Sequence, residues 1–396
     1  MAKSDKHPND VLTETLLVHG GRDRELTGQF VSPPVVRAST VLFDNTAQLK
    51  GEESIRYTYG LTNTPTIEAL VSIINDLEQS HGTVLVPSGL ASCTIAIMAA
   101  VKAGDQILIP DNVYGPTRRF CDGTLKDFGI DVTYYDPLIG QDIKTLFKPN
   151  IKAIFMEAPG SHTFEMPDVK AFIAAAKEVG ATTTIDNTWA SPLFFKPVPA
   201  GIDYSIQAAT KYLAGHSDAL IGSISTNEKH WGDLKRTHQN FGVQAGTEEM
   251  YLTLRGMRTM ALRMDRQEEN ALMIAHWLQE QPEVSRVLHP ALPEDPGHAL
   301  WKDLIGRSSG LFGFVLKDLG DDAAAALLDG LELFGLGYSW GGFESLAVLS
   351  QVGHIRTATK WQEGATIRLS IGLEHPDDLM KDIRAGLDRA KAVGEG

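Results

Sequence analysis

Two ionisable residues near the middle of the chain stand where apolar, strand-like segments end. Lys211 follows the segment IDYSIQAAT, and Asp186 closes the segment ATTTID. A lysine at the end of a buried strand costs desolvation free energy unless a partner or a reaction holds it there. An amine and a carboxylate so placed would suit a cofactor with a carbonyl group and a basic ring nitrogen. The amine can form an imine with the carbonyl, and the carboxylate can pair with the protonated ring.

A phosphate-binding turn is predicted at residues 87–92, PSGLAS, between the strand-like segment TVLV and a helical segment. Gly89 lets the backbone approach an anion closely, and a helix N-terminus presents free N–H groups. Thr210, directly before Lys211, can add a hydroxyl donor to the same phosphate. Such a turn is a weak signal by itself, and the neighbouring amine and carboxylate strengthen it.

Three further positions each allow a functional and a structural interpretation. Tyr114, in DNVYGPTRR, is either a turn residue before Pro116 or an aromatic lid on a planar cofactor, with a phenol able to exchange protons. Arg368, inside the strand-like TIRLSIG, is either half of an internal ion pair or a bidentate ligand for a substrate's α-carboxylate. Trp340, in the glycine-bounded loop YSWGG, either faces the cleft between domains or packs in the interior.

These residues need a scaffold that brings strand ends together. From about residue 66, helical segments alternate with short apolar runs, which predicts βαβ units and a mainly parallel sheet. Ligands of such sheets bind outside the carboxyl ends of the strands, where both ionisable residues fall. The stretch from Thr247 to about Glu283 is strongly helical, with Thr247 as a plausible N-cap, and is expected to form a connector helix out of the large domain. The segments VSRVLH, LFGFVL and TIRLSIG, with two helical segments, predict a smaller α+β domain after it.

The chain has 396 residues, of which 43% are hydrophobic, so it can bury a large core and is expected to form two domains. We expect an N-terminal arm over residues 1–60 that packs on a neighbouring subunit, because an extended polar arm seldom folds on itself. A large domain is expected over residues 61–256. A connector helix and a small C-terminal domain are expected over residues 257–396.

The composition also limits which binding partners and which cellular compartment we expect. A formal net charge of −14 argues against nucleic acid or an anionic membrane as a partner. The two cysteines, Cys93 and Cys121, are too few for a disulfide framework, and neither they nor the histidines show metal-ligand spacing. No apolar run approaches the ~18 residues that a membrane-spanning helix needs. We therefore expect a cytoplasmic protein without a metal site.

The sequence resembles the pyridoxal-phosphate (PLP) enzymes of cysteine and methionine metabolism, and within them the bacterial cystathionine β-lyases. The resemblance covers about residues 10–390 and is carried by SIQAATKYLAGHSDALIG, IDNTWA, MEAPGS, YSWGGFESL and IRLSIGLE. It implies the aspartate-aminotransferase-like fold, fold type I of the PLP-dependent transferases. That fold combines a large, mixed but mainly parallel α/β sheet domain with a smaller C-terminal α+β domain. The resemblance also implies a homotetramer built from two catalytic dimers.

The resemblance implies roles for the residues that match the family's motifs. Lys211 would bind PLP as an imine and move the substrate's protons, with Tyr114 sharing in proton transfer and stacking on the ring. Asp186 would pair with the ring nitrogen. The other implied contacts are to the phosphate (Gly89, Leu90 and Thr210), to the neighbouring subunit's cofactor (Tyr59), to the substrate carboxylate (Ser339 and Arg368) and to the pocket wall (Trp340).

The chain departs from the family pattern at one clear position. The pattern Tyr-x-Arg, whose arginine holds the phosphate of the adjacent subunit, here reads Tyr59-Gly60-Leu61. A charge-assisted contact of this kind is worth about 1.5–3 kcal/mol. Arg56 lies nearby and could reach the phosphate instead. A smaller departure is Ala208, where many relatives carry a phosphate-binding serine.

The resemblance implies β-elimination of L-cystathionine to homocysteine, pyruvate and ammonia, a transsulfuration step of methionine biosynthesis. Trp340 favours this reaction, because relatives that act as γ-synthases or γ-lyases usually have a leucine there. The alternative in the same fold is γ-elimination, γ-replacement, cysteine desulfhydrase activity or racemisation. A catalytically silent cofactor-binding protein is the third hypothesis, suggested only by the leucine at position 61.

Overall fold

The large sheet lies at the centre of the chain and organises its fold. The computed structural model describes residues 11–353 and 355–394. The strands of the sheet are β1 (Gly82–Val86), β2 (Gln106–Pro110), β3 (Asp131–Tyr135), β4 (Ile151–Glu157), β5 (Thr182–Asp186), β6 (Tyr204–Gln207) and β7 (Gly222–Thr226). Their order is β1-β7-β6-β5-β4-β2-β3. Strand β7 runs antiparallel to both neighbours and the other pairs are parallel, so the prediction of a mainly parallel sheet is confirmed.

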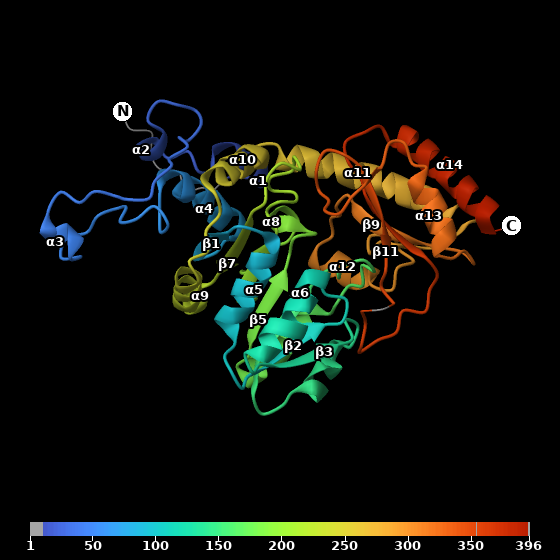
Figure 1. Cartoon of the computed structure of the whole chain (residues 1–396), viewed down its shortest axis with the longest axis horizontal. Helices are drawn as coiled ribbons and strands as arrows, with labels where there is room; N and C mark the ends of the chain where they lie inside the picture. Colours follow the sequence, from blue (N-terminus) through green and yellow to red (C-terminus); the bar gives the residue numbers. More distant parts are fainter. Residues whose placement is uncertain (1–10, 354, 395–396) are drawn as a thin grey trace.

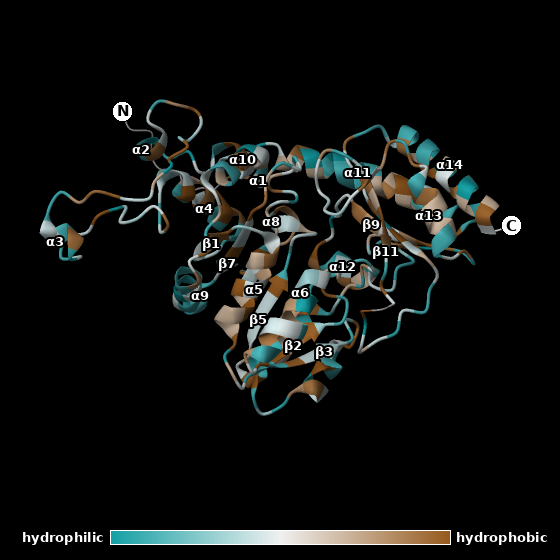
Figure 2. Cartoon of the chain, in the orientation of Figure 1, coloured by the Kyte–Doolittle hydropathy of each residue, from teal (hydrophilic) through white to brown (hydrophobic). Residues whose placement is uncertain are grey.

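Helices lie on both faces of this sheet, which explains why its central strands are buried along nearly their whole length. The helices are α4 (Pro65–Glu78), α5 (Gly89–Ala100), α6 (Gly115–Phe120), α7 (Val169–Val179), α8 (Ser191–Phe194) and α9 (Glu228–Phe241). Short helical turns follow α6 at Cys121–Leu125 and lie at Gly140–Leu146. Figure 2 shows the apolar residues concentrated in the strands and in α5, whereas α9 is largely hydrophilic on the outside.

The smaller domain is built on a second sheet. Its strands are β8 (Val284–Leu288), β9 (Leu311–Leu316), β10 (Gly335–Leu336), β11 (Leu346–Ser350) and β12 (Thr366–Ser370), in the order β10-β11-β12-β9-β8. Helices α13 (Asp321–Asp329) and α14 (Pro376–Gly394) pack on this sheet, and α12 (His298–Leu304) lies toward the large domain (Figure 1). The sequence predicted β8, β9 and β12 and missed β10 and β11.

The expected connecting helix is in fact two helices, so that prediction was wrong. Helix α10 (Thr247–Met257) begins with Gly246, not Thr247, at the N-cap position, and α11 (Met260–Gln279) follows after a break. The break arises because the Gly256 carbonyl accepts hydrogen bonds from Thr259 N and Arg263 Nη2 instead of continuing the helix. Arg258 at the break donates to the carbonyls of Leu17 and Gly20 beside α1 (Thr13–His19).

An arm leads into the large domain and extends away from it (Figure 1). It carries α1, α2 (Arg24–Thr27) and α3 (Thr46–Leu49), and Phe30 and Leu42 are among its strongly exposed apolar side chains. Residues 1–10 of the predicted arm lie outside the described residues. Nowhere in residues 11–353 and 355–394 is there a helix of the length and apolar character needed to span a bilayer.

Glu78, at the end of α4, supports a first prediction about stability. Its carboxyl is fully buried and accepts hydrogen bonds from Ser205 Oγ at 3.0 Å and Gln207 Nε2 at 3.2 Å. Burial raises its pKa from 4.5 to about 7. The folded state therefore keeps a proton that the unfolded chain releases, and stability should fall as the pH rises from about 4.5 to about 7. The full loss should be on the order of 3 kcal/mol.

Glu78→Gln should remove this pH dependence, which urea unfolding between pH 4.5 and 8 would measure. Glu280→Gln, at an exposed position after α11, is the matched control and should keep the wild-type slope. An unchanged slope in Glu78→Gln would show that the Glu78 carboxyl does not hold its proton in the folded state.

Candidate active site

The carboxyl ends of five strands meet at one edge of the large sheet. Because β7 is antiparallel to both β1 and β6, β1 points the same way as β2, β4, β5 and β6. This edge carries Gly89 after β1, Tyr114 after β2, Glu157 at the end of β4, Asp186 at the end of β5 and Lys211 after β6. Strand β6 stops at Gln207, earlier than predicted, because the chain turns away there: Ala208 N donates to Thr188 Oγ1.

Lys211 meets a loop of the small domain. Its Nζ donates to Ser339 Oγ at 2.6 Å and lies 5.2 Å from the centre of the Trp340 ring. Trp340 also packs on Tyr212 at 5.4 Å, so it both packs and faces the amine. Burial, and then the nearby Arg368 guanidinium, lower the pKa of Lys211 from 10.5 to about 8. A substantial neutral fraction of the amine is therefore present near neutral pH, as a general base requires.

The loop approaches Lys211 closely because its backbone takes unusual conformations. Ser339 has a φ of 82° and Gly341 a φ of 80°, both in the left-handed region. A Cβ on Gly341 would lie 3.2 Å from the backbone carbon of Lys211, tighter than ordinary contacts, so glycine is needed at this position.

Asp186 is held by neighbours that leave its negative charge uncompensated. Thr188 donates to Oδ1 from its backbone N at 3.0 Å and from its hydroxyl at 2.5 Å, and Cys93 Sγ donates to Oδ2 at 3.7 Å. No cation in the described part of the chain forms an ion pair with it. Burial raises the pKa of Asp186, although these hydrogen bonds and the charge on Lys211 act to lower it. A protonated ring nitrogen is the kind of partner that such a carboxylate lacks, so the site fits PLP at this point.

Glu157 is a site residue that the sequence reasoning missed. It is directly across from Asp186 in the register of β4 and β5. Its carboxyl accepts hydrogen bonds from Tyr114 N at 2.8 Å and from Ser161 Oγ at 2.5 Å. Burial, and then the Asp186 charge, raise its pKa to about 8. Its place at the end of the apolar run AIFME, at the same sheet edge as Asp186, was the signal that could have identified it.

The predicted phosphate end of the site has a narrow glycine-lined turn. Ser88 caps α5 by accepting from Ala91 N, so the first N–H groups of the helix, including that of Leu90, have no partner within the helix. A Cβ on Gly89 would lie 2.5 Å from the Cβ of Ala208, which leaves room for nothing larger than glycine. The hydroxyl of Thr210 already donates to the Ile221 carbonyl at 3.1 Å. That contact gives Thr210 a structural role, and donation to a phosphate would require its proton to turn.

Arg368 extends from β12 toward the same recess. Its Nη2 donates to the Ser339 carbonyl at 3.2 Å, and no described carboxylate lies within ion-pair distance. Burial lowers the pKa of Arg368 to about 10, and the neighbouring Tyr114 phenol acts in the opposite direction. The alternative of an internal ion pair is therefore wrong for this arginine. A half-buried guanidinium without a carboxylate partner suits a carboxylate ligand.

Tyr114 lies among the residues around Asp186 and Arg368, whereas Tyr59 does not. Tyr114 precedes α6 and is 40% exposed, and burial, with the nearby Cys93 and Asp186, raises the pKa of its phenol. Tyr59 lies on the arm, is 48% exposed, and its hydroxyl accepts only a weak bond from Ser39 Oγ at 3.5 Å. Within one chain, Tyr59 therefore makes no hydrogen bond to the Lys211 group.

Arg56, which lies near the position of the missing arginine, is paired within its own chain. Its guanidinium donates to Glu68 at 2.6 Å and to Glu25 at 2.9 Å, and it lies over the Tyr57 ring. These carboxylates raise the pKa of Arg56. Leu61 is partly exposed, and its carbonyl accepts from Gln244 Nε2 at 3.0 Å. In this arrangement the Arg56 guanidinium is paired with acidic residues of its own chain, and Leu61 supplies no charge.

Comparisons with known proteins show which sequences and structures this chain resembles. The family model described as Cys/Met metabolism PLP-dependent enzyme matches residues 14–388. The chain is 49% identical over 383 residues, 96% of each chain, to a Rhizobium johnstonii protein provisionally named a cystathionine beta-lyase. It is 41% identical over 386 residues to the cystathionine beta-lyase of Haemophilus influenzae, covering 95% of this chain and 98% of that one. A solved structure of cystathionine gamma synthase from Xanthomonas oryzae pv. oryzae matches with a TM-score of 0.88 and 31% identity, over 96% of this chain and 99% of that chain.

Proposed function

The chain belongs to the PLP-dependent enzymes of cysteine and methionine metabolism, and from that premise we propose that it is a carbon–sulfur lyase acting on L-cystathionine. β-Elimination, with uptake of water that releases the amino group, would give homocysteine, pyruvate and ammonia, a step of methionine biosynthesis. The observation that carries the proposal is the loop at residues 338–342, which sets Ser339 and Trp340 against the Lys211 amine. Relatives named cystathionine beta-lyase at 49% and 41% identity support this choice over γ-chemistry. The fold alone does not decide, because a γ-synthase shares it.

Each residue has a defined part in the proposed mechanism. When bound, PLP supplies an electron sink that stabilises negative charge at the substrate's Cα. Asp186 would keep the ring nitrogen protonated, and Arg368 would hold the α-carboxylate so that the Cα–H bond is oriented for proton removal. The neutral Lys211 amine, oriented by Ser339, would take that proton. The Cβ–S bond then breaks, and Lys211 or Tyr114 would return a proton to the leaving thiolate.

The remaining contacts belong to the same proposal. The first N–H groups of α5, at Gly89 and Leu90, would hold the phosphate together with Thr210, and Trp340 would shape the substrate pocket. Tyr59 would reach the site of a neighbouring subunit, since its ring lies exposed on the arm. We place the arm at residues 1–60, the large domain at 61–256 and the connector with the small domain at 257–396. The enzyme would act in the cytoplasm as a homotetramer of two catalytic dimers.

Leu61→Arg should tighten PLP binding. A charge-assisted contact of about 1.5–3 kcal/mol corresponds to a roughly 10- to 100-fold lower Kd. Titration of the apoprotein with PLP, followed by intrinsic fluorescence, would measure the change. Leu61→Met, which adds no charge, is the control and should leave the Kd unchanged. Equal affinity in Leu61→Arg and wild type would show that this position does not face the phosphate of the adjacent subunit.

The proposed function is tested by a product assay on the purified protein with PLP and L-cystathionine. Pyruvate with homocysteine is the expected result. 2-Oxobutyrate with cysteine would instead assign γ-elimination and overturn the role given to Trp340. A protein that binds PLP and forms neither keto acid would contradict the proposed substrate.

A further inference from the structure

A segment of the small domain is tied by buried polar contacts to the large domain beside the site. We call residues 355–364 the strap; it leads from β11 into β12, the strand that carries Arg368. Asp111, directly after β2, is fully buried, and its carboxylate accepts from the backbone N of Thr357 and Ala358, each at 2.9 Å. It also accepts from Thr359 N at 2.8 Å and forms an ion pair with Arg118 at 3.0 Å.

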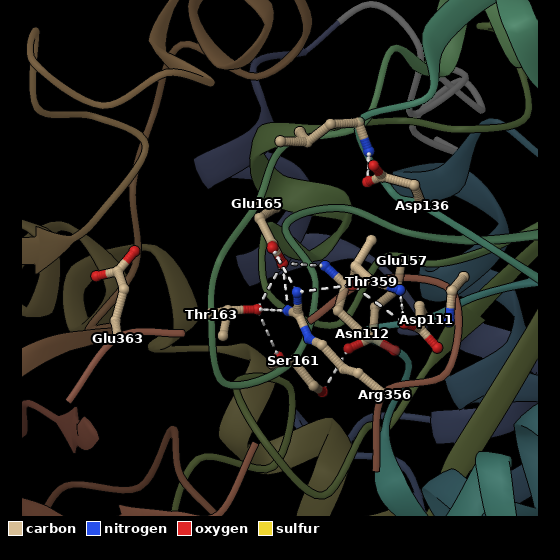
Figure 3. A network of polar contacts seen from close by, with 12 residues as sticks. Asp111, Asn112, Asp136, Glu157, Ser161, Thr163, Glu165, Arg356, Thr359 and Glu363 are labelled. Carbon is tan, nitrogen blue, oxygen red and sulfur yellow. Dashed lines mark hydrogen bonds and ion pairs between the residues drawn. The ribbon is translucent and has the colours of Figure 1, made fainter. Parts of the chain in front are cut away.

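Arg356 makes the second half of this attachment. Its guanidinium donates to both carboxylate oxygens of Glu165, at 2.8 and 2.7 Å, and to the hydroxyl of Thr163. Asn112 donates to the same Glu165 carboxylate at 2.8 Å. The Arg356 side chain is only 3% exposed. We call Asp111, Arg118, Glu165 and Arg356 the clasp, and Figure 3 shows most of its bonds converging within one small region.

The clasp connects the two halves of the proposed substrate site. On the large-domain side, Asp111 lies three residues before Tyr114, and Glu165 follows the loop that begins at Glu157. On the small-domain side, the strap runs directly into the strand of Arg368. The clasp therefore joins the part of the large domain next to Tyr114 to the segment that precedes Arg368.

Burial distinguishes the clasp from an exposed ion pair that also joins the two domains. Lys170 and Asp303 also pair across the domains, at 2.5 Å, but their side chains are 62% and 60% exposed. Exposed pairs of this kind contribute little, whereas breaking a buried, hydrogen-bonded pair leaves an uncompensated charge. The three backbone N–H groups of residues 357–359 and the hydroxyls of Thr357 and Thr359 all donate to the buried Asp111 carboxylate. Glu363, farther along the strap, pairs with Arg286 of its own domain and lies well apart from the clasp (Figure 3).

We propose that Asp111 and Arg356 are positioning residues that hold the small domain against the large domain and so fix Arg368 where it can bind a substrate α-carboxylate. This assignment rests on the proposed carboxylate role of Arg368. It predicts that weakening the clasp lowers affinity for amino acids before it lowers the rate of the chemical step.

The test compares Asp111→Asn and Arg356→Gln with the strap control Glu363→Gln and the interdomain control Asp303→Asn, all as PLP-loaded protein. The first readout is hydrogen exchange, and the backbone amides of Thr357, Ala358 and Thr359 should exchange faster in the two clasp variants. The second is the Kd of L-alanine, which has the α-carboxylate but no leaving group, followed by cofactor absorbance. We expect this Kd to rise about tenfold, the effect of one lost charge-assisted bond. With L-cystathionine, KM should rise by a larger factor than kcat falls, because Arg368 both binds the carboxylate and orients the Cα–H bond.

Several results would overturn the proposal. Faster exchange with an unchanged L-alanine Kd would make the clasp purely structural, and a fall in kcat at constant KM would contradict positioning of the carboxylate. Equal effects in the control variants, or no L-alanine binding by wild type, would also exclude it. If Asp111→Asn fails to fold, Arg356→Lys, which keeps the charge, should show a smaller change than Arg356→Gln. If wild type binds L-alanine but releases no keto acid from L-cystathionine, the proposed function is wrong. The hydrogen exchange and the L-alanine Kd of the variants would still test the role of the clasp.

Discussion

Lys211→Ala should abolish release of pyruvate from L-cystathionine while leaving the fold intact. Loss of a positioned general base alone lowers a rate by about 10²- to 10⁴-fold, and this variant also loses the amine that would bind the cofactor. The fold should persist because Lys211 contributes one hydrogen bond, to Ser339, and no ion pair among the described residues. Pyruvate release and circular dichroism would measure the two outcomes.

The control for this variant is Lys170→Ala, which removes an exposed lysine on α7 and should keep activity. Turnover by Lys211→Ala above about 1% of the wild-type rate would contradict the assignment. The loss of rate would then be smaller than the roughly 100-fold loss expected when a general base is removed.

The lowered pKa of Lys211 gives an independent measurement. In the apoprotein the folded state loses its proton near pH 8, whereas the unfolded chain keeps it to about 10.5. Because the unfolded state binds more protons between these values, wild-type stability should gain a contribution that rises across this window. Lys211→Met should lack that rise. An identical dependence in both proteins would show that the folded-state pKa is not lowered.

Asp186→Asn should lower kcat by roughly 10²- to 10³-fold, the range found when one preorganised electrostatic contact is removed from a site. The amide keeps the shape of the carboxylate, so Thr188 can still donate to the same oxygen, but the negative charge that favours a protonated ring nitrogen is lost. The variant should also bind PLP more weakly, which titration of the apoprotein would measure.

Thr188→Ser is the control for Asp186→Asn, since it keeps the hydroxyl that donates to Asp186 and should retain most activity. A wild-type kcat in Asp186→Asn would exclude a role for the charge in the reaction.

The sequence predicted the sheet edge well, because strand ends can be located from local apolar patterns. Lys211, Asp186, Gly89 and Tyr114 lie where the alternation of strands and helices places them. It could not predict the loop contact between Ser339 and Lys211, which depends on left-handed backbone conformations and on how two domains meet. The periodic pattern of apolar residues along a helix or strand does not predict such a contact.

Other features could not be predicted from the sequence for related reasons. The break between α10 and α11 depends on the side chain of Arg263 capturing the Gly256 carbonyl, a contact that helical periodicity cannot reveal. Asp111 and Arg356 act only after distant segments come together. The pairing of Arg56 with Glu25 and Glu68 also depends on segments that meet only in the folded chain.

The division of the site between two domains has a consequence for how specificity can evolve. Cofactor contacts are assigned to strand ends of the large sheet, while Ser339, Trp340 and Arg368 come from a loop and a strand of the other domain. Ser339 and Gly341 are tied to the cofactor side because they contact Lys211, whereas a change at Trp340 would alter the pocket wall and leave the strand ends in place. A lineage carrying this architecture would therefore diversify its substrates through the pocket wall of the small domain, while the strand ends of the large sheet are inherited unchanged.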